Sequence, residues 1–148
     1  MIGDEKDKKF RPMISFDFDG VMATTNGFKG HHTAGEPIRD VLEAIQKLKD
    51  FGCVIIVHST KGKGIIRDFC NRHNVPVDYI NENPEIPSEN RGKPVSAIHI
   101  DDRALNYHGQ SADELLEEIK NFKVYWKNEG HSQEYFKALK DYEEKSSS

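Results

Sequence analysis

The segment Cys53–His58 is the part of the chain that most limits the choice of fold. It reads C-V-I-I-V-H, a continuous run of apolar and mostly β-branched residues. A strand with one face in water alternates apolar and polar residues, whereas a strand covered on both faces is apolar throughout. We therefore expect this segment to be an internal strand of a parallel sheet.

Further strand-like and helical patterns alternate along the chain. Besides Cys53–His58, strands are expected at 13–17, 77–80 and 96–100, with a short edge strand at 123–126. A helix is expected at 37–50, with Pro37 in the first turn and Gly52 just past the end. A second helix is expected after the turn Ser59–Gly64, with Ile65, Ile66, Phe69 and Cys70 inward, and a third after the capping box Ser111–Glu114. A last helix is expected around Tyr135–Tyr142. This order predicts an α/β fold, a Rossmann-like three-layer α/β sandwich with a parallel sheet.

Bulk properties limit the class of protein. The 148 residues suggest one core domain at 13–126, between a flexible segment at 1–12 and a helical tail at 127–148. A net charge of −4 gives no general attraction to nucleic acid or to an anionic membrane. The chain has no apolar stretch near the ~20 residues of a membrane span, and its first residues lack the apolar region of a secretion signal. Cys53 and Cys70 fall in apolar segments, so we expect buried free thiols and a cytoplasmic protein.

The first strand ends in two carboxylates. Met13–Val21 reads M-I-S-F-D-F-D-G-V, and alternation along an extended chain places Asp17 and Asp19 on the same side. Close like charges resist joint ionisation unless a cation or a shared proton offsets them. Gly20 permits a bend or a close backbone approach. A strand end followed by an ordinary Asp-Gly turn is the simpler interpretation of this segment alone.

Two other strands also end in polar residues. Ser59 and Thr60 follow the second strand, Asp101 and Asp102 follow the fourth, and Lys93 lies shortly before the fourth. Parallel strands bring these ends to one edge of the sheet, where open α/β sheets bind ligands. Simpler interpretations remain for each: turn formers for the hydroxyls, a helix N-cap pair for the carboxylates, and a solvated loop residue for the lysine.

These residue types suit phosphoryl transfer. Several carboxylates make an all-oxygen site for a hard cation such as Mg²⁺. Hydroxyls and backbone N–H groups hold phosphate oxygens, and a lysine neutralises negative charge beside them. An aspartate can also act as the nucleophile and form an aspartyl-phosphate.

The order D-x-D-G-V, hydroxyl, Lys and D-D resembles the haloacid dehalogenase superfamily of phosphohydrolases. The resemblance covers about residues 13 to 107, and Gly92–Pro94 with Ile100–Arg103 is similar to its small capless members from bacteria and phage. It implies that Asp17 is the nucleophile and a metal ligand. It implies that Asp19 protonates the leaving group and then activates water, while its backbone carbonyl binds Mg²⁺.

The remaining roles also follow from this resemblance. Ser59 would hydrogen-bond the phosphoryl group beside the backbone of Thr60, with Gly20 as a further phosphate contact. Lys93 would bridge Asp17 and the phosphate. Asp102 would be a direct metal ligand and Asp101 would hold metal-bound water, although the two carboxylates could exchange roles. Where close relatives often have Arg two residues after the motif hydroxyl, this chain has Lys61, which lacks bidentate geometry.

The motif spacing also predicts an open site. Neither the interval from Gly20 to Cys53 nor that from Thr60 to Lys93 has room for a cap domain, so we expect none. The substrate would be a phosphomonoester, either small (a nucleotide or sugar phosphate) or the end of a macromolecule. Nucleic acid is not indicated by the charge, and a second copy of the chain could cover the site. His31 and His32, in the loop after the nucleophile, are weak candidates for substrate contacts. The alternative function is a regulatory module that accepts or binds phosphate with little turnover.

Overall fold

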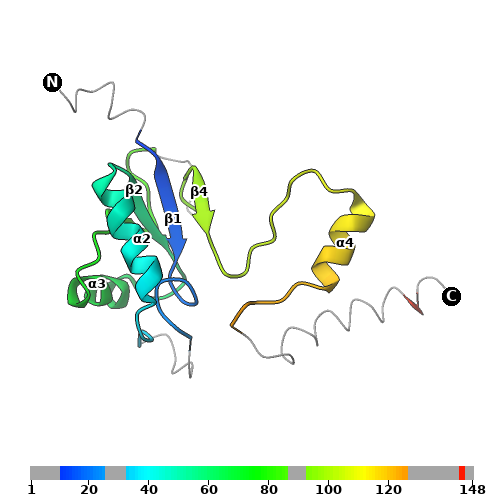
Figure 1. The fold of residues 1–148 in the computed structure, drawn as a ribbon, viewed down its shortest axis with the longest axis horizontal. Coiled ribbons are helices and arrows are strands. Elements are labelled where there is room, and N and C mark those ends of the chain that lie inside the picture. The colour runs from blue at the N-terminus through cyan, green and yellow to red at the C-terminus, as the bar shows by residue number, and fades with distance from the viewer. Residues whose placement is uncertain (1–10, 26–32, 87–92, 127–143, 146–148) are drawn as a thin grey trace. The chain divides into compact units, whose positions relative to one another are not determined.

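The computed structural model describes residues 11–25, 33–86, 93–126 and 144–145. The chain divides into two compact units, Met1–Asp101 and Asp102–Ser148. The first unit contains the sheet and helices α2 and α3, and the second contains helix α4 (Figure 1). The predictions for the first ten residues, for His31 and His32 and for a last helix in the tail lie outside the described residues. The division into segments 1–12, 13–126 and 127–148 stays a prediction.

The sheet has four parallel strands in the order β3-β2-β1-β4. The strands are β1 (Met13–Asp17), β2 (Val54–His58), β3 (Tyr79–Ile80) and β4 (Ile98–Ile100). Asp17 is in register with His58 on one neighbour of β1, and Phe16 is in register with Ile100 on the other. The predicted α/β Rossmann-like fold with a parallel sheet is confirmed, and β1 lies between two partners.

Helices α2 (Arg39–Asp50) and α3 (Lys63–Arg72) cover one face of this sheet. That face carries the in-register pairs Ile14–Ile55 and Phe16–Val57, which form the core together with apolar side chains of both helices. The rings of Phe18 and Phe69 meet edge to face, with centroids 5.0 Å apart. Both crossovers run in the same direction across the sheet, and right-handed connections of this kind place their helices on the same side.

The predicted elements differ from the structure mainly at their ends. Helix α2 begins at Arg39 and not at Pro37, because the preceding residues pair with the turn after β1. Pro37 forms an antiparallel bridge with Ala23, and the N–H of Ile38 donates to the carbonyl of Met22 at 2.8 Å. Strand β3 is likewise shorter than the predicted 77–80. The buried free thiols predicted for the chain are confirmed: both cysteines are buried and unpaired.

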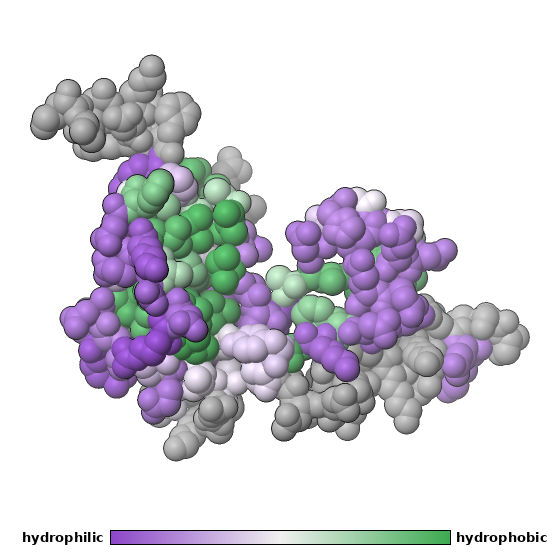
Figure 2. All heavy atoms as spheres, viewed as in Figure 1, coloured by the Kyte–Doolittle hydropathy of each residue, from purple (hydrophilic) through white to green (hydrophobic). Residues whose placement is uncertain are grey.

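Strand β4 leaves apolar side chains in contact with solvent. Ile98 and Ile100 are 53% and 39% exposed, and Val95 just before them is 43% exposed. Figure 2 shows hydrophobic residues gathered on the visible surface of the unit that carries the sheet. The fourth strand therefore differs from β2, which is buried along almost its whole length as predicted.

The second unit contains α4 (Ala112–Lys120), and its predicted capping box is confirmed. The Ser111 hydroxyl accepts a hydrogen bond from the N–H of Glu114 at 3.2 Å and lies 3.0 Å from that residue's carboxylate. Residues 123–126 do not form the predicted edge strand, and 125–126 lie in a turn. None of the helices in the described part of the chain is both long and apolar enough to cross a membrane.

Candidate active site at the carboxyl edge of the sheet

Carboxylates gather where β1 and β4 end. Phe16 pairs with Ile100, so the next residues on these neighbouring strands are Asp17 and Asp101. Carboxylate oxygens of Asp17, Asp101 and the adjoining Asp102 all lie within 4.8 Å of one another. Such close like charges favour a cation among them. The structure thus brings together three of the predicted metal ligands.

The two carboxylate oxygens of Asp102 have different surroundings. Its Oδ2 accepts a hydrogen bond from the indole N–H of Trp126 at 2.5 Å. Its Oδ1 is buried and has no hydrogen-bond partner among the described residues. A buried carboxylate oxygen is normally hydrogen-bonded, so this one is a candidate ligand for a cation. The donor chemistry fits a hard divalent cation such as Mg²⁺.

A tight turn after β1 presents Asp19. The carbonyl of Phe18 accepts hydrogen bonds from the N–H groups of Met22 and Ala23, at 2.9 and 3.1 Å. Gly20 has a φ of 85°, a left-handed value that favours glycine, and its N–H donates to the carbonyl of Ala23 at 2.7 Å. The ring of Phe18 is fully buried, which anchors the turn. The Asp19 side chain is 34% exposed.

Lys61 forms an ion pair with Asp19 that the sequence analysis did not predict. Its side chain is only 3% exposed, and its Nζ lies 3.3 Å from Oδ1 of Asp19. The same ammonium donates to the carbonyl of Thr33 at 2.5 Å and lies 6.0 Å from the centroid of the Phe18 ring. The sequence shows a basic residue two positions after the motif hydroxyl, but this pattern does not predict that its side chain is buried.

Ser59 lies directly after β2, and Asn81 holds its backbone. The Ser59 N–H donates to the side-chain oxygen of Asn81 at 2.8 Å, and its hydroxyl accepts from the N–H of Lys61 at 3.0 Å. The hydroxyl therefore forms a local turn, as the simpler interpretation predicted. This contact does not exclude phosphate binding, since a hydroxyl still has its own proton to donate. Thr60 beside it is exposed.

Lys93, the predicted bridge between nucleophile and phosphate, is an exposed residue. Its charge acts on His99 of β4. The pKa of His99 is lowered first by burial and then by the positive charges of Lys93 and His58, while Asp101 acts in the opposite direction. The predicted role of Lys93 toward Asp17 stays a prediction.

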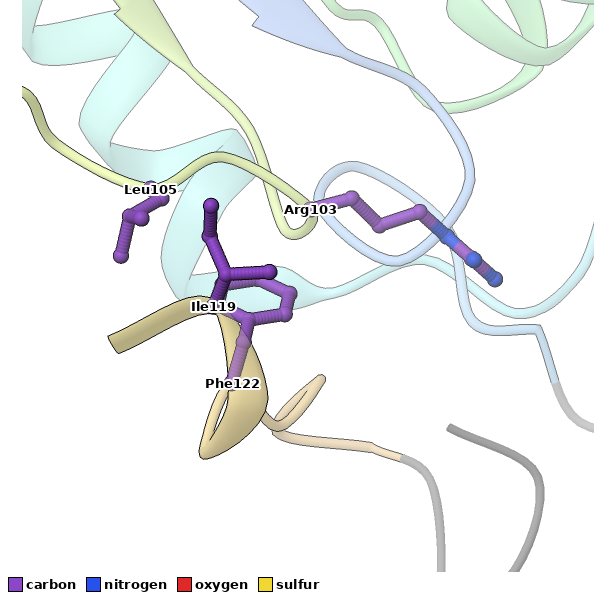
Figure 3. A pocket seen from close by; sticks show the side chains of 4 residues that line it. All are labelled: Arg103, Leu105, Ile119 and Phe122. Carbon is purple, nitrogen blue, oxygen red and sulfur yellow. The ribbon is translucent and has the colours of Figure 1, made fainter. Parts of the chain in front are cut away.

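The second unit contains a shallow hollow of about 140 Å³. Figure 3 shows the side chains that line it: Arg103, Leu105, Ile119 and Phe122. The guanidinium of Arg103 also stacks over the Trp126 ring, 5.2 Å from its centroid. None of the predicted site residues lines this hollow.

Comparisons with known proteins address the fold. No protein-family model matches the chain, and no curated protein matches it. Among solved structures, the chain is similar to that of a conserved protein coded by a locus of Bacteroides thetaiotaomicron, with 20% sequence identity and a TM-score of 0.51. The match covers 80% of this chain and 99% of the other. At this identity the likeness shows a shared fold.

Proposed function

We propose that the protein is a Mg²⁺-dependent phosphohydrolase that cleaves a phosphomonoester through an aspartyl-phosphate on Asp17. The observation that carries this proposal is the group of carboxylate oxygens from Asp17, Asp101 and Asp102, all within 4.8 Å of one another at the ends of two paired strands. A hydroxyl residue, Ser59, follows the neighbouring strand on the other side of β1. This is the edge at which open parallel sheets bind ligands.

The same residues would hold the cation. Asp17, Asp101 and Asp102 would supply carboxylate oxygens, one of which is buried and has no hydrogen-bond partner among the described residues. The backbone carbonyl of Asp19 would be a further ligand. When bound, Mg²⁺ would neutralise the acidic group and draw charge from the phosphoryl oxygens.

The chain's own side chains divide the chemistry between them. A carboxylate oxygen of Asp17 attacks phosphorus, and the bond from phosphorus to the leaving oxygen breaks as Asp19 gives that oxygen a proton. Asp19 then takes a proton from water while the water oxygen bonds to phosphorus and the Asp17–phosphorus bond breaks. The products are the alcohol and inorganic phosphate. General acid–base assistance of this kind contributes typically ~10²–10⁴-fold.

Phosphate oxygens need donors at the same edge. The Ser59 hydroxyl and the backbone N–H of Thr60 would supply these donors from the end of β2. The N–H of Gly20, the other predicted phosphate contact, already donates to the carbonyl of Ala23 at 2.7 Å. Lys93 supplies positive charge when the phosphate is bound. The substrate class is a phosphomonoester, since the carboxylates, the metal and the hydroxyl donors all address a phosphoryl group.

The test is Mg²⁺-dependent phosphate release from a panel of nucleotides, sugar phosphates, phosphopeptides and 5′- or 3′-phosphorylated oligonucleotides. Asp17→Asn and Asp19→Asn are compared with Asp40→Asn, an exposed aspartate in the first turn of α2. We expect the first two to lose activity and the third to keep it. EDTA should abolish hydrolysis of every substrate.

The alternative function has its own outcome in this experiment. A regulatory module would release no phosphate from any substrate and would instead accumulate a long-lived acyl-phosphate on Asp17, detectable by mass spectrometry. That result would contradict the hydrolase proposal. Activity that persists in Asp17→Asn would contradict both.

A further inference from the structure

Lys61 is a buried ammonium in a protein whose other charged side chains are mostly in water. The whole residue is 4% exposed, and in the described part of the chain no other Lys, Arg, Asp or Glu is buried. An ammonium loses its hydration when it is buried, so it persists there only with partners that compensate.

The partners of Lys61 come from two segments far away in sequence. Its Nζ lies 3.3 Å from Oδ1 of Asp19 and donates to the carbonyl of Thr33 at 2.5 Å. The ammonium also lies over the Phe18 ring, 6.0 Å from its centroid, at the outer limit of a cation–π contact. A lysine suits this arrangement because its compact ammonium can donate to separate oxygens in different directions, which the planar guanidinium of arginine does less freely.

The backbone of Lys61 is fixed as well. Its N–H donates to the Ser59 hydroxyl at 3.0 Å, and Gly62, which follows it, is the N-cap of α3. The residue is therefore held between the end of β2 and the start of a helix. The position of the ammonium relative to the end of β1 is set by the fold and not by a mobile side chain.

We propose that Lys61 is a positioning residue for Asp19. It holds Oδ1, so that the other carboxylate oxygen faces the leaving oxygen of a phosphoester bound at Asp17, and it ties the segment at Thr33 to the same point. This inference rests on the proposed function. It assigns to Lys61 an effect on proton transfer, with no contact to the phosphate.

Leaving-group chemistry separates this role from a structural one. A 4-nitrophenolate leaves without a proton, whereas an alkoxide requires one from the general acid. If Lys61 places Asp19, removal of the ammonium slows the alkyl ester far more than the aryl ester. A general loss of folding or of phosphate binding slows both equally.

The experiment compares kcat/KM, which includes only the steps up to departure of the leaving group, for glycerol 1-phosphate and 4-nitrophenyl phosphate in the full chain with Mg²⁺. For Lys61→Met we expect kcat/KM to fall at least about a hundredfold on the alkyl ester and less than about tenfold on the aryl ester. Lys61→Arg, which retains the charge, should recover part of the alkyl activity. Lys63→Met removes an exposed lysine two positions away, paired with Glu82 at 3.5 Å, and should match wild type.

Each result has a distinct meaning. Equal losses on the two esters, or none, would overturn the positioning role and leave the proposed function intact. A wild-type chain inactive on both esters, and on the substrate panel, would overturn the proposed function itself and with it the role of Lys61. If circular dichroism shows that Lys61→Met is unfolded, the same ratio of losses is measured on Lys61→Gln, which retains a donor for the Thr33 carbonyl.

Discussion

The side-chain oxygen of Asn81 accepts a hydrogen bond from the backbone N–H of Ser59 at 2.8 Å. Asn81 follows β3 with a φ of 57°, a left-handed backbone that asparagine tolerates better than most residues. The residue that follows β3 thereby fixes the residue that follows β2, the neighbouring strand in the sheet. This contact fixes the candidate phosphate-binding turn, although β3 itself contributes no group to the proposed chemistry.

Removing the Asn81 side chain should loosen the turn at Ser59. Asn81→Gly keeps the backbone conformation and loses the acceptor, which costs about 1 kcal/mol of unfolding free energy. Asn81→Ala should lower the free energy of unfolding by about 1 kcal/mol more than Asn81→Gly does, because an alanine is strained at positive φ. Urea denaturation measures both. Asn74→Gly is the control, since Asn74 has the same kind of backbone (φ 53°) away from the sheet edge, and it should change stability little.

The segment that carries Thr33 is packed too closely for a larger residue at Gly35. A Cβ at Gly35 would overlap the carbonyl oxygen of Thr24, whose N–H donates to the carbonyl of Glu36 at 2.8 Å. We expect Gly35→Ala to cost about 2–3 kcal/mol by overpacking, seen as a lower urea midpoint. In Gly64→Ala the new Cβ meets no atom within 4 Å, and the change sits in α3. For Gly64→Ala we expect the free energy of unfolding to rise by about 0.5–1 kcal/mol, because alanine favours a helix more than glycine does. A loss of stability of equal size in both variants would contradict the packing argument.

Burial raises the pKa of the Cys70 thiol from 9.0 to about 11, although the charge of Arg67 acts in the opposite direction. The folded protein therefore holds its thiol proton more tightly than the unfolded chain does between these two values. Stability should be unaffected below pH 9 and should fall as the pH rises from 9 to 11, because the unfolded state then releases the proton first. Urea unfolding across this range checks the slope, and Cys70→Ala should flatten it.

The same burial predicts slow thiol labelling. At pH 8 the thiolate fraction of Cys70 is about a hundredfold below that of a thiol at the ordinary pKa, from the difference between 9.0 and about 11. Reaction with a disulfide reagent should be slow in buffer and fast in denaturant. Rapid labelling of both cysteines in buffer would show that the core opens readily.

The single tryptophan of the chain reports on the candidate metal site. Trp126 donates to Asp102, so Mg²⁺ binding at that carboxylate should change its fluorescence. Asp102→Asn should abolish the change and raise the Mg²⁺ concentration that gives half-maximal activity by more than tenfold. Asp101→Asn should keep the fluorescence change and raise that concentration about tenfold or less. The reverse order would assign the direct ligand to Asp101.

The sequence predicted the parts of the fold that depend on local pattern. The apolar run of β2 and the amphipathic stripe of α2 follow from periodicity alone, and the meeting of Asp17 with Asp101 follows from parallel pairing. The start of α2 was predicted at Pro37 and lies at Arg39, because a bridge between Pro37 and Ala23 competes with the first helical turn. Tertiary pairing overrides a terminal preference of this kind.

The support around the site could not be predicted in the same way. A lysine between two polar turns is most often solvated, and the burial of Lys61 depends on Asp19 and Thr33, which no local pattern connects to it. Asn81 likewise acts on Ser59 across 22 positions of sequence. The exposure of Ile98 and Ile100 was not predicted either, because an apolar strand is expected to be covered by other parts of the protein.

The strand order has a consequence for the growing chain on the ribosome. Strand β1 is made first, yet one of its edges waits for β2 and the other for β4, whose last residue is Ile100. Until then an unpaired edge of β1 remains open to other chains. Both late pairings join distant positions, which makes them slow. The acidic group at Asp17 is thus completed only after β4 and the residues that follow it have been made, so the candidate metal site and the paired sheet edge form at the same stage.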